Sequence, residues 1–258
     1  MPVRRGLAVA VVLVAGLAAS GCSDDAPSGA AGPDEGSTPT ELTTTTAPTT
    51  TTTVAERSGR PLQIVEQGLS TFPDPIDPTS ELVGYGVVLA NPNGDVMAAG
   101  VRVVTRVLDG TGAELLSDSA LLNGILPGAR MAVGRTLVEP IEGAARLAVE
   151  LEVSAWLEPA SPDGRLVAEG VVTEPEEAGG SVTRFTVRST WPEEEEGVDA
   201  TAVYRAADGR ILSAESTSVA LVPSDDTVAS QIRLLTPIPD LATTEVFVGR
   251  GFDALTIG

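Results

Sequence analysis

The sequence predicts an all-β protein in which two tandem β-sandwiches follow a signal peptide and a disordered Thr/Pro-rich linker. Several segments after Pro61 alternate apolar and polar residues with a period of two, which is typical of half-buried strands. No stretch after Pro61 has a convincing helical period of 3.6 over a dozen residues. Similar segments also recur about 97 positions apart, which indicates an internal duplication.

Residues 1–21 have the features of a secretory signal. Two arginines precede an uncharged apolar run over residues 6–19, which is shorter than the roughly 20 residues that a membrane-spanning helix needs. The run ends in LAASGC at residues 17–22, which resembles a bacterial lipobox with Ala19 in place of the usual Leu. The resemblance implies cleavage before Cys22, lipidation of its thiol, and attachment to the extracytoplasmic face of the cell membrane. The alternative is a soluble secreted protein in which Cys22 has no role.

Residues 22–60 form the predicted linker. Thr, Pro, Ser, Gly and Ala dominate this stretch, with uninterrupted threonine runs at Thr43–Thr46 and Thr49–Thr53. Such a segment has too little apolar surface to offset the entropy lost on ordering, so we expect a disordered stalk. Stalks of this composition can carry O-linked glycans, and the sequence leaves open whether this one does.

The duplication divides the remaining chain into two units, residues 61–158 and 163–258. Val101–Val107 is echoed by Val198–Tyr204 at a spacing of 97, and Leu126-Pro127 by Val222-Pro223 at a spacing of 96. The short segment 159–162 joins the two units. We therefore expect each unit to have its own core and to fold independently.

Each unit is predicted to consist of strands separated by turns. The clearest apolar faces are Leu147, Val149, Leu151 and Val153; Tyr85, Val87 and Leu89; and Ala200, Ala202 and Tyr204. Turn sequences lie between them, namely Asn91-Pro92-Asn93-Gly94, Asp109-Gly110, Pro127-Gly128, Asp163-Gly164 and Asp208-Gly209. Units of about 95 residues with this pattern predict two immunoglobulin-like sandwiches.

Two of these strands also carry a family resemblance. Thr105–Asp109 resembles the pattern that names the FxLyD-type domain of bacterial surface lipoproteins, with the leading aromatic replaced. Tyr204–Asp208 resembles it with Tyr for Phe and Ala at the two later apolar sites. The resemblance covers most of both units and implies an immunoglobulin-like fold at the cell surface, without catalytic residues to carry over.

The residue content argues against catalysis. The chain has no His and a single Cys, so it lacks the most common general base and cannot form an internal disulfide. No G-x-S-x-G motif is present to hold a serine nucleophile. We therefore expect a protein that is not an enzyme and that has no cofactor.

The acidic run Glu193–Glu196, with Asp199 close by, is the strongest candidate for a cation site. Calcium needs six to eight oxygens arranged around the ion, whereas consecutive loop residues point in different directions. We therefore predict a solvated loop and no metal ligand, and the sequence leaves cation binding there open. Trp156 and Phe252 are predicted to be packing residues rather than platforms for sugars.

The net charge of −20 bears on the partners. Such a surface repels phosphate backbones, so nucleic acid is not an expected partner. The expected function is a non-enzymatic envelope lipoprotein, held by lipid on Cys22, that presents its domains to an unidentified envelope protein. One alternative is a ligand-binding lipoprotein of a transport system, which normally has two α/β lobes. The other is a structural surface protein without a specific partner.

Overall fold

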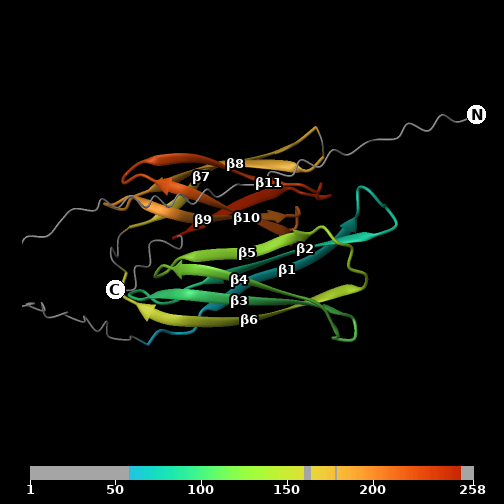
Figure 1. Cartoon of the computed structure of the whole chain (residues 1–258), viewed down its shortest axis with the longest axis horizontal. Helices are drawn as coiled ribbons and strands as arrows, with labels where there is room; N and C mark the ends of the chain where they lie inside the picture. The colour runs from blue at the N-terminus through green and yellow to red at the C-terminus, as the bar shows by residue number, and fades with distance from the viewer. Residues whose placement is uncertain (1–57, 160–163, 178, 251–258) are drawn as a thin grey trace, which may run out of the picture. The chain divides into compact units, whose positions relative to one another are not determined.

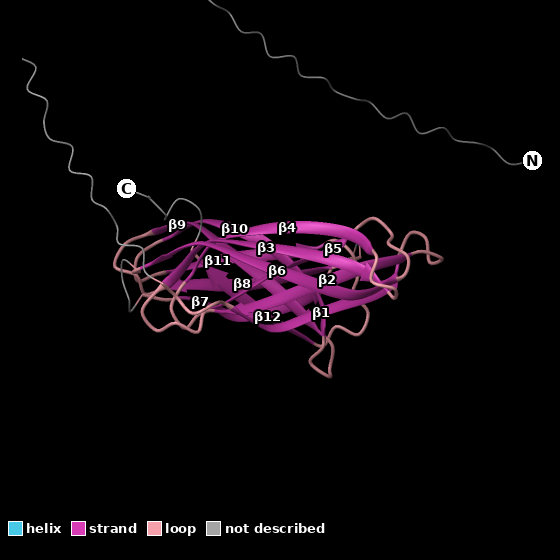
Figure 2. Cartoon of the chain, turned by 90° about the horizontal axis from the view of Figure 1, so that it is seen from below, coloured by secondary structure: helices cyan, strands magenta, loops and turns pink. Residues whose placement is uncertain are grey.

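The computed structural model describes residues 58–159, 164–177 and 179–250, so the signal sequence, Cys22 and nearly all of the linker lie outside the described residues. The described residues form twelve strands and no helix (Figure 2), which confirms the all-β prediction. Within these ranges there is accordingly no helix that could cross a membrane.

The first repeat contains six strands in two antiparallel sheets. The strands are β1 (Gln63–Pro73), β2 (Glu81–Ala90), β3 (Met97–Asp109), β4 (Glu114–Ile125), β5 (Arg130–Leu137) and β6 (Ala144–Leu157). One sheet has the order β1-β2-β5 and the other β4-β3-β6. Leu147, Val149, Leu151 and Val153 of β6 pack on the buried cluster between them, as their alternation predicts.

The second repeat has the same strand order, shifted by six. Its strands are β7 (Leu166–Pro175), β8 (Ser181–Ser189), β9 (Glu195–Arg205), β10 (Ile211–Val222), β11 (Thr227–Leu234) and β12 (Thr243–Gly249). Its sheets are β7-β8-β11 and β10-β9-β12. The register of the strand pairs is repeated as well. Val103 pairs with Leu151 in the first repeat. In the second repeat Ala200 pairs with Val248, and each of these residues lies 97 positions after its counterpart. The shared register supports the predicted duplication.

The hairpin turns fall where the sequence places them. Asp109 ends β3, and its Oδ1 accepts hydrogen bonds from the Thr111 backbone N at 2.8 Å and the Ala113 backbone N at 2.9 Å. The equivalent Asp208 accepts one from the Arg210 N at 3.0 Å, and Gly209 takes the positive φ of 85° that the turn requires. The predicted boundary between the repeats, residues 159–162, lies between β6 and β7.

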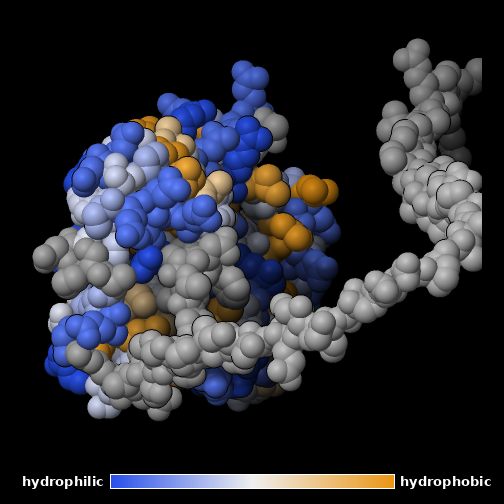
Figure 3. All heavy atoms as spheres, turned by 60° about the vertical axis from the view of Figure 1, so that its left-hand side comes forward, coloured by the Kyte–Doolittle hydropathy of each residue, from blue (hydrophilic) through white to orange (hydrophobic). Residues whose placement is uncertain are grey.

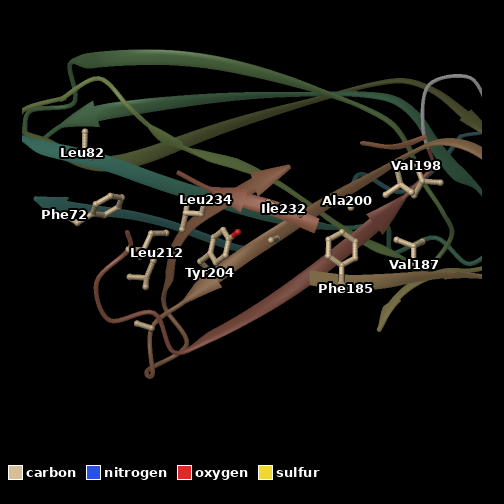
Figure 4. Packing of buried hydrophobic residues seen from close by; sticks show 14 of the residues in the cluster. Phe72, Leu82, Phe185, Val187, Val198, Ala200, Tyr204, Leu212, Ile232 and Leu234 are labelled. Carbon is tan, nitrogen blue, oxygen red and sulfur yellow. The ribbon is translucent and has the colours of Figure 1, made fainter. Parts of the chain in front are cut away.

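A second connection between the repeats was not predicted. In Figure 1 the four sheets lie in layers, and the β1-β2-β5 sheet of the first repeat packs against the β10-β9-β12 sheet of the second. Strand β10 contacts β1, β2 and β5 alike. Phe72 and Leu82 of the first repeat belong to the same buried cluster as Leu212 and Leu234 of the second (Figure 4). The described part of both repeats falls within one compact unit.

Candidate functional site

Glycines on the first repeat let the two sheets approach closely. Gly84 and Gly86 of β2 lie under β10: a Cβ added at Gly84 would be 2.4 Å from the Leu212 carbonyl oxygen, and one at Gly86 would be 2.9 Å from the Ile211 Cγ2. Cβ atoms essentially never lie this close to another heavy atom, so a larger residue at either position would force the facing strand or side chain to shift. The interface is therefore shaped for backbone contact, which fixes the two repeats against each other.

Apolar and polar contacts complete this interface. A small buried cluster joins the repeats and consists of Val88 and Ala132 on one side and Val203, Ile211, Ala214 and Phe247 on the other. The Arg205 guanidinium bonds to the Glu66 carboxylate of the first repeat at 2.5 Å. Because Arg205 is largely buried, this pair lies in a medium that screens it less than bulk water does.

Beyond this cluster the same face of the second repeat becomes polar. Alternate residues of a strand share a face, so Val203, Thr201 and Asp199 of β9 follow one another along one side of the sheet. Ser218 of β10 pairs in register with Asp199, and Ser216 with Thr201. The Thr201 and Ser216 hydroxyls are 2.9 Å apart and hydrogen-bonded. A row of hydroxyl and carboxyl groups therefore continues from the point where the apolar contact ends.

This polar face forms one wall of a cleft of about 450 Å³. The other wall comes from β4 and β5 of the first repeat, with Asp118 and Leu121 from β4 and Arg135 from β5. Clefts at junctions between domains are common ligand sites. Because the lining comes from both repeats, the cleft exists only when the two sandwiches are docked.

On the first repeat's side of the cleft, the charges are already paired. The Asp118 carboxylate accepts a hydrogen bond from the Tyr85 hydroxyl and lies 2.9 Å from the Arg135 Nε. Burial, together with the neighbouring Asp118 carboxylate, holds the pKa of Tyr85 well above its usual range. Tyr85 is therefore a neutral donor, and Arg135 has a carboxylate as its partner.

On the second repeat's side, Asp199 has no cationic partner among the described residues. Its Oδ2 accepts one hydrogen bond, from the Asn123 side-chain amide at 3.2 Å. Burial raises the pKa of Asp199 above its ordinary value, and the hydrogen bond from Asn123 opposes this only in part. The cleft thus contains one half-buried carboxylate whose charge no described group balances.

Glu215 holds the edge of β5 next to the cleft. Its Oε1 accepts a hydrogen bond from the Thr136 backbone N at 2.9 Å, which satisfies an outward N–H of this edge strand. Burial raises the pKa of Glu215. The side chain therefore ties β10 to β5 while its charge is only partly solvated.

The predicted acidic loop is only partly solvated. Glu193, Glu194 and Glu196 are exposed, as predicted. The Glu195 side chain is only 3% exposed. The Arg250 guanidinium donates two hydrogen bonds to the Glu195 carboxylate, at 2.8 and 3.0 Å. The prediction was wrong for this residue, because the loop begins β9 and alternate strand positions face inward.

The remaining sequence-predicted residues do not join the cleft. Trp156 packs against the core of the first sandwich, as predicted. Phe252 and the proposed lipidation site Cys22 lie outside the described residues. Asp199, which sequence reasoning grouped with the acidic loop, lies in the cleft instead. The alternation Val203-Thr201-Asp199 is the only sequence signal that would have shown an apolar face turning polar.

The fold and the cleft define a class of protein, a pair of docked β-sandwiches with a polar cleft at their junction. In comparisons with known proteins, no family model and no curated protein matches the chain.

Proposed function

We propose that this chain is a lipid-anchored binding protein on the extracytoplasmic face of the cell membrane, and that it holds an envelope protein partner in the cleft between its repeats. The observation that carries the proposal is the cleft itself, in which Asp199 is half-buried and no described residue balances its charge. A buried charge without a partner costs free energy. Groups with perturbed pKa values cluster at functional sites, so a half-buried carboxylate in a cleft is a candidate binding residue.

The docked repeats suit a binding role. Because glycines allow backbone contact between the sheets, the two walls of the cleft are held at a fixed separation. A preorganised site loses little entropy when it binds, which raises affinity without additional contacts. The surface seen in Figure 3 is mainly hydrophilic, with small groups of hydrophobic residues.

Membrane attachment would come from the N-terminal segment. Lipid on Cys22 would anchor the chain, and a linker of the predicted composition reaches on the order of 100 Å at most when extended at about 3.1 Å per residue. The sandwiches would therefore meet partners within that distance of the membrane.

The anchor has a direct test. Cys22→Ser should release the protein from the membrane fraction into the soluble fraction, because the lipid bonds to that thiol. Fractionation of cells after a high-salt wash measures the change, with the unaltered chain as control. A variant that stays with the membranes would contradict the proposed anchor and leave the cleft proposal intact.

The transport alternative is less well supported. Ligand-binding lipoproteins of transport systems normally have two α/β lobes, and the described residues of this chain include twelve strands and no helix. The remaining alternative, a structural surface protein without a partner, is separated from our proposal by crosslinking.

Leu121 and Val172 provide a matched pair of crosslinking positions. Leu121 lines the cleft and is 55% exposed, whereas Val172 on β7 is 53% exposed and lies outside it. A photo-reactive phenylalanine analogue at each position, illuminated in intact producing cells, reports what lies nearby. We expect a discrete protein adduct from position 121 and none from position 172. No adduct at 121, or equal adducts at both positions, would contradict a specific partner in the cleft.

A further inference from the structure

The charge balance of the cleft identifies the kind of group it can receive. Asp118 already has Arg135 as its ion-pair partner. No described arginine lies within ion-pair distance of Asp199, whose one hydrogen-bond donor is the Asn123 amide. The cleft therefore has one surplus negative charge, supplied by a single carboxylate.

The groups around Asp199 are hydrogen-bond acceptors in suitable positions. The Ser218 position pairs with Asp199 across β10 and β9, and the Thr201 and Ser216 hydroxyls lie one pair further along the same face. Hydroxyl oxygens accept hydrogen bonds, and a guanidinium presents five N–H donors in a planar fork. One carboxylate and several hydroxyls therefore match a guanidinium or an ammonium group.

On this basis we propose that the cleft binds a basic side chain, arginine or lysine, of the protein partner, with Asp199 as its counter-ion. This inference rests on the proposed function and names the chemistry of that same site. An arginine can bond to the carboxylate in bidentate fashion, which makes it the better fit of the two.

Other ligands fit the cleft less well. A bound calcium ion needs six to eight oxygen ligands, and only one uncommitted carboxylate is available here. An anion would meet the Asp118 and Asp199 carboxylates against a single lining arginine, Arg135, which is already paired. The volume of about 450 Å³ exceeds that of a lone ion and accommodates a side chain with part of its backbone.

The charge of the whole chain acts in the same direction. A net charge of −20 attracts basic partners over distances of about a Debye length and raises their rate of encounter. Burial removes water from the Asp199 carboxylate and so raises its pKa. A cation bound in the cleft would stabilise the charged carboxylate in place of that water. Long-range attraction and local compensation therefore favour the same class of partner.

The test is an NMR titration of the full mature chain carrying Cys22→Ser. The probes are N-acetyl-arginine-methylamide and its neutral isostere N-acetyl-citrulline-methylamide. We expect the Asn123 side-chain amide signal to shift and to saturate with the arginine probe, and to stay unchanged with the citrulline probe. Equal responses to both probes, or no saturable response, would overturn the inference.

Two variants make the test specific. Asp199→Asn keeps the side-chain volume and should weaken binding of the arginine probe about tenfold or more. Glu152→Gln, which removes one exposed negative charge from β6, should leave the affinity unchanged. A thermal melt of each variant shows that it is folded. Asp199→Asn binding as tightly as the parent chain would overturn the inference.

Crosslinking separates this inference from the function on which it rests. If Asp199→Asn abolishes the protein adduct formed from position 121, the inference is supported. If the adduct forms at the parent yield, the basic-group inference fails while the cleft remains a partner site.

Discussion

At the residue scale, the Glu195–Arg250 pair is the most buried ion pair in the described chain. Both side chains are largely buried, at 3% and 11% exposure, and the Arg250 guanidinium also lies 4.5 Å from the ring centroid of Trp191. A buried pair is not necessarily stabilising compared with apolar residues, but removing one member leaves an uncompensated charge. The pair therefore ties the end of β12 to the start of β9.

This pair leads to a prediction about stability. Arg250→Ala should lower the free energy of unfolding by about 3 kcal/mol, because it leaves the Glu195 carboxylate buried without a partner. Urea denaturation measures the change. Arg184→Ala, which breaks an exposed pair with Glu174, is the control and should cost less than about 1 kcal/mol. The double variant Arg250→Ala/Glu195→Gln should recover part of the loss, and no recovery would show that Trp191 packing dominates.

Glu215 leads to a prediction about pH. Its raised pKa means that the folded chain binds the proton more tightly than the unfolded chain, whose reference pKa is 4.5. The resulting stability is fully present below pH 4.5 and is lost as the pH rises through the folded pKa. Glu215→Gln keeps an acceptor for the Thr136 N–H and removes the charge. It should therefore raise the free energy of unfolding at pH 7 by about 1 kcal/mol.

The same variant should have little effect at pH 4, where the parent carboxyl is protonated. Urea denaturation of both proteins at both pH values measures the difference. An equal gain at both pH values would show that the charge of Glu215 is not the cause.

At the scale of strands, the sequence predicted β6 better than β2. The outer face of β6 is solvated, so its inward residues stand out by alternation. In β2 the face Tyr85, Val87 and Leu89 was also predicted correctly, but Gly84 and Gly86 on the opposite face are buried as well. Glycine has no side chain to give a hydropathy signal. Leu82 and Val88 on the same face as these glycines are buried too, so the near-continuous apolar run of β2 indicates two covered faces, which the alternation of Tyr85, Val87 and Leu89 alone does not.

Gly84 leads to a prediction about the interface between the sheets. In Gly84→Ala the new Cβ would lie 2.4 Å from the Leu212 carbonyl oxygen, so the two sheets must separate. Overpacking of this kind should cost about 2 kcal/mol of unfolding free energy. Gly94→Ala is the matched control, because nothing lies within 4 Å of its added Cβ. Equal stability of the two variants would contradict the close approach.

At the scale of the whole molecule, the cleft could not be predicted because it depends on how the repeats dock. The sequence predicted two sandwiches of the same kind, and the repeated register supports this. The apolar residues on the second face of β2 indicate that this face is covered, but they do not identify which sheet of the other repeat covers it. Asp199 acquires its position only when β9 lies opposite β4 and β5. The location of the cleft therefore required the structure.

The docking also bears on whether each repeat folds independently, which remains a prediction. Residues 164–258 alone would expose Val203, Ile211, Ala214 and Phe247, which the first repeat now covers. We expect this fragment to bind the dye ANS several-fold more strongly than residues 58–258 and to melt at a lower temperature. Size-exclusion chromatography would show self-association through the same face. A fragment with the dye binding and melting temperature of the longer chain would demonstrate independence.

The docking of unlike faces also bears on whether a further copy of the repeat could pack in the same way. The first repeat offers its β1-β2-β5 sheet and the second its β10-β9-β12 sheet, so in geometry a third copy could add to the free β7-β8-β11 sheet. That sheet carries Arg184, Arg188 and Arg233, each paired with a glutamate, in place of a glycine-lined surface. Like the polar caps of repeat proteins, these ion pairs leave this sheet without the close-packing surface by which the first repeat docks.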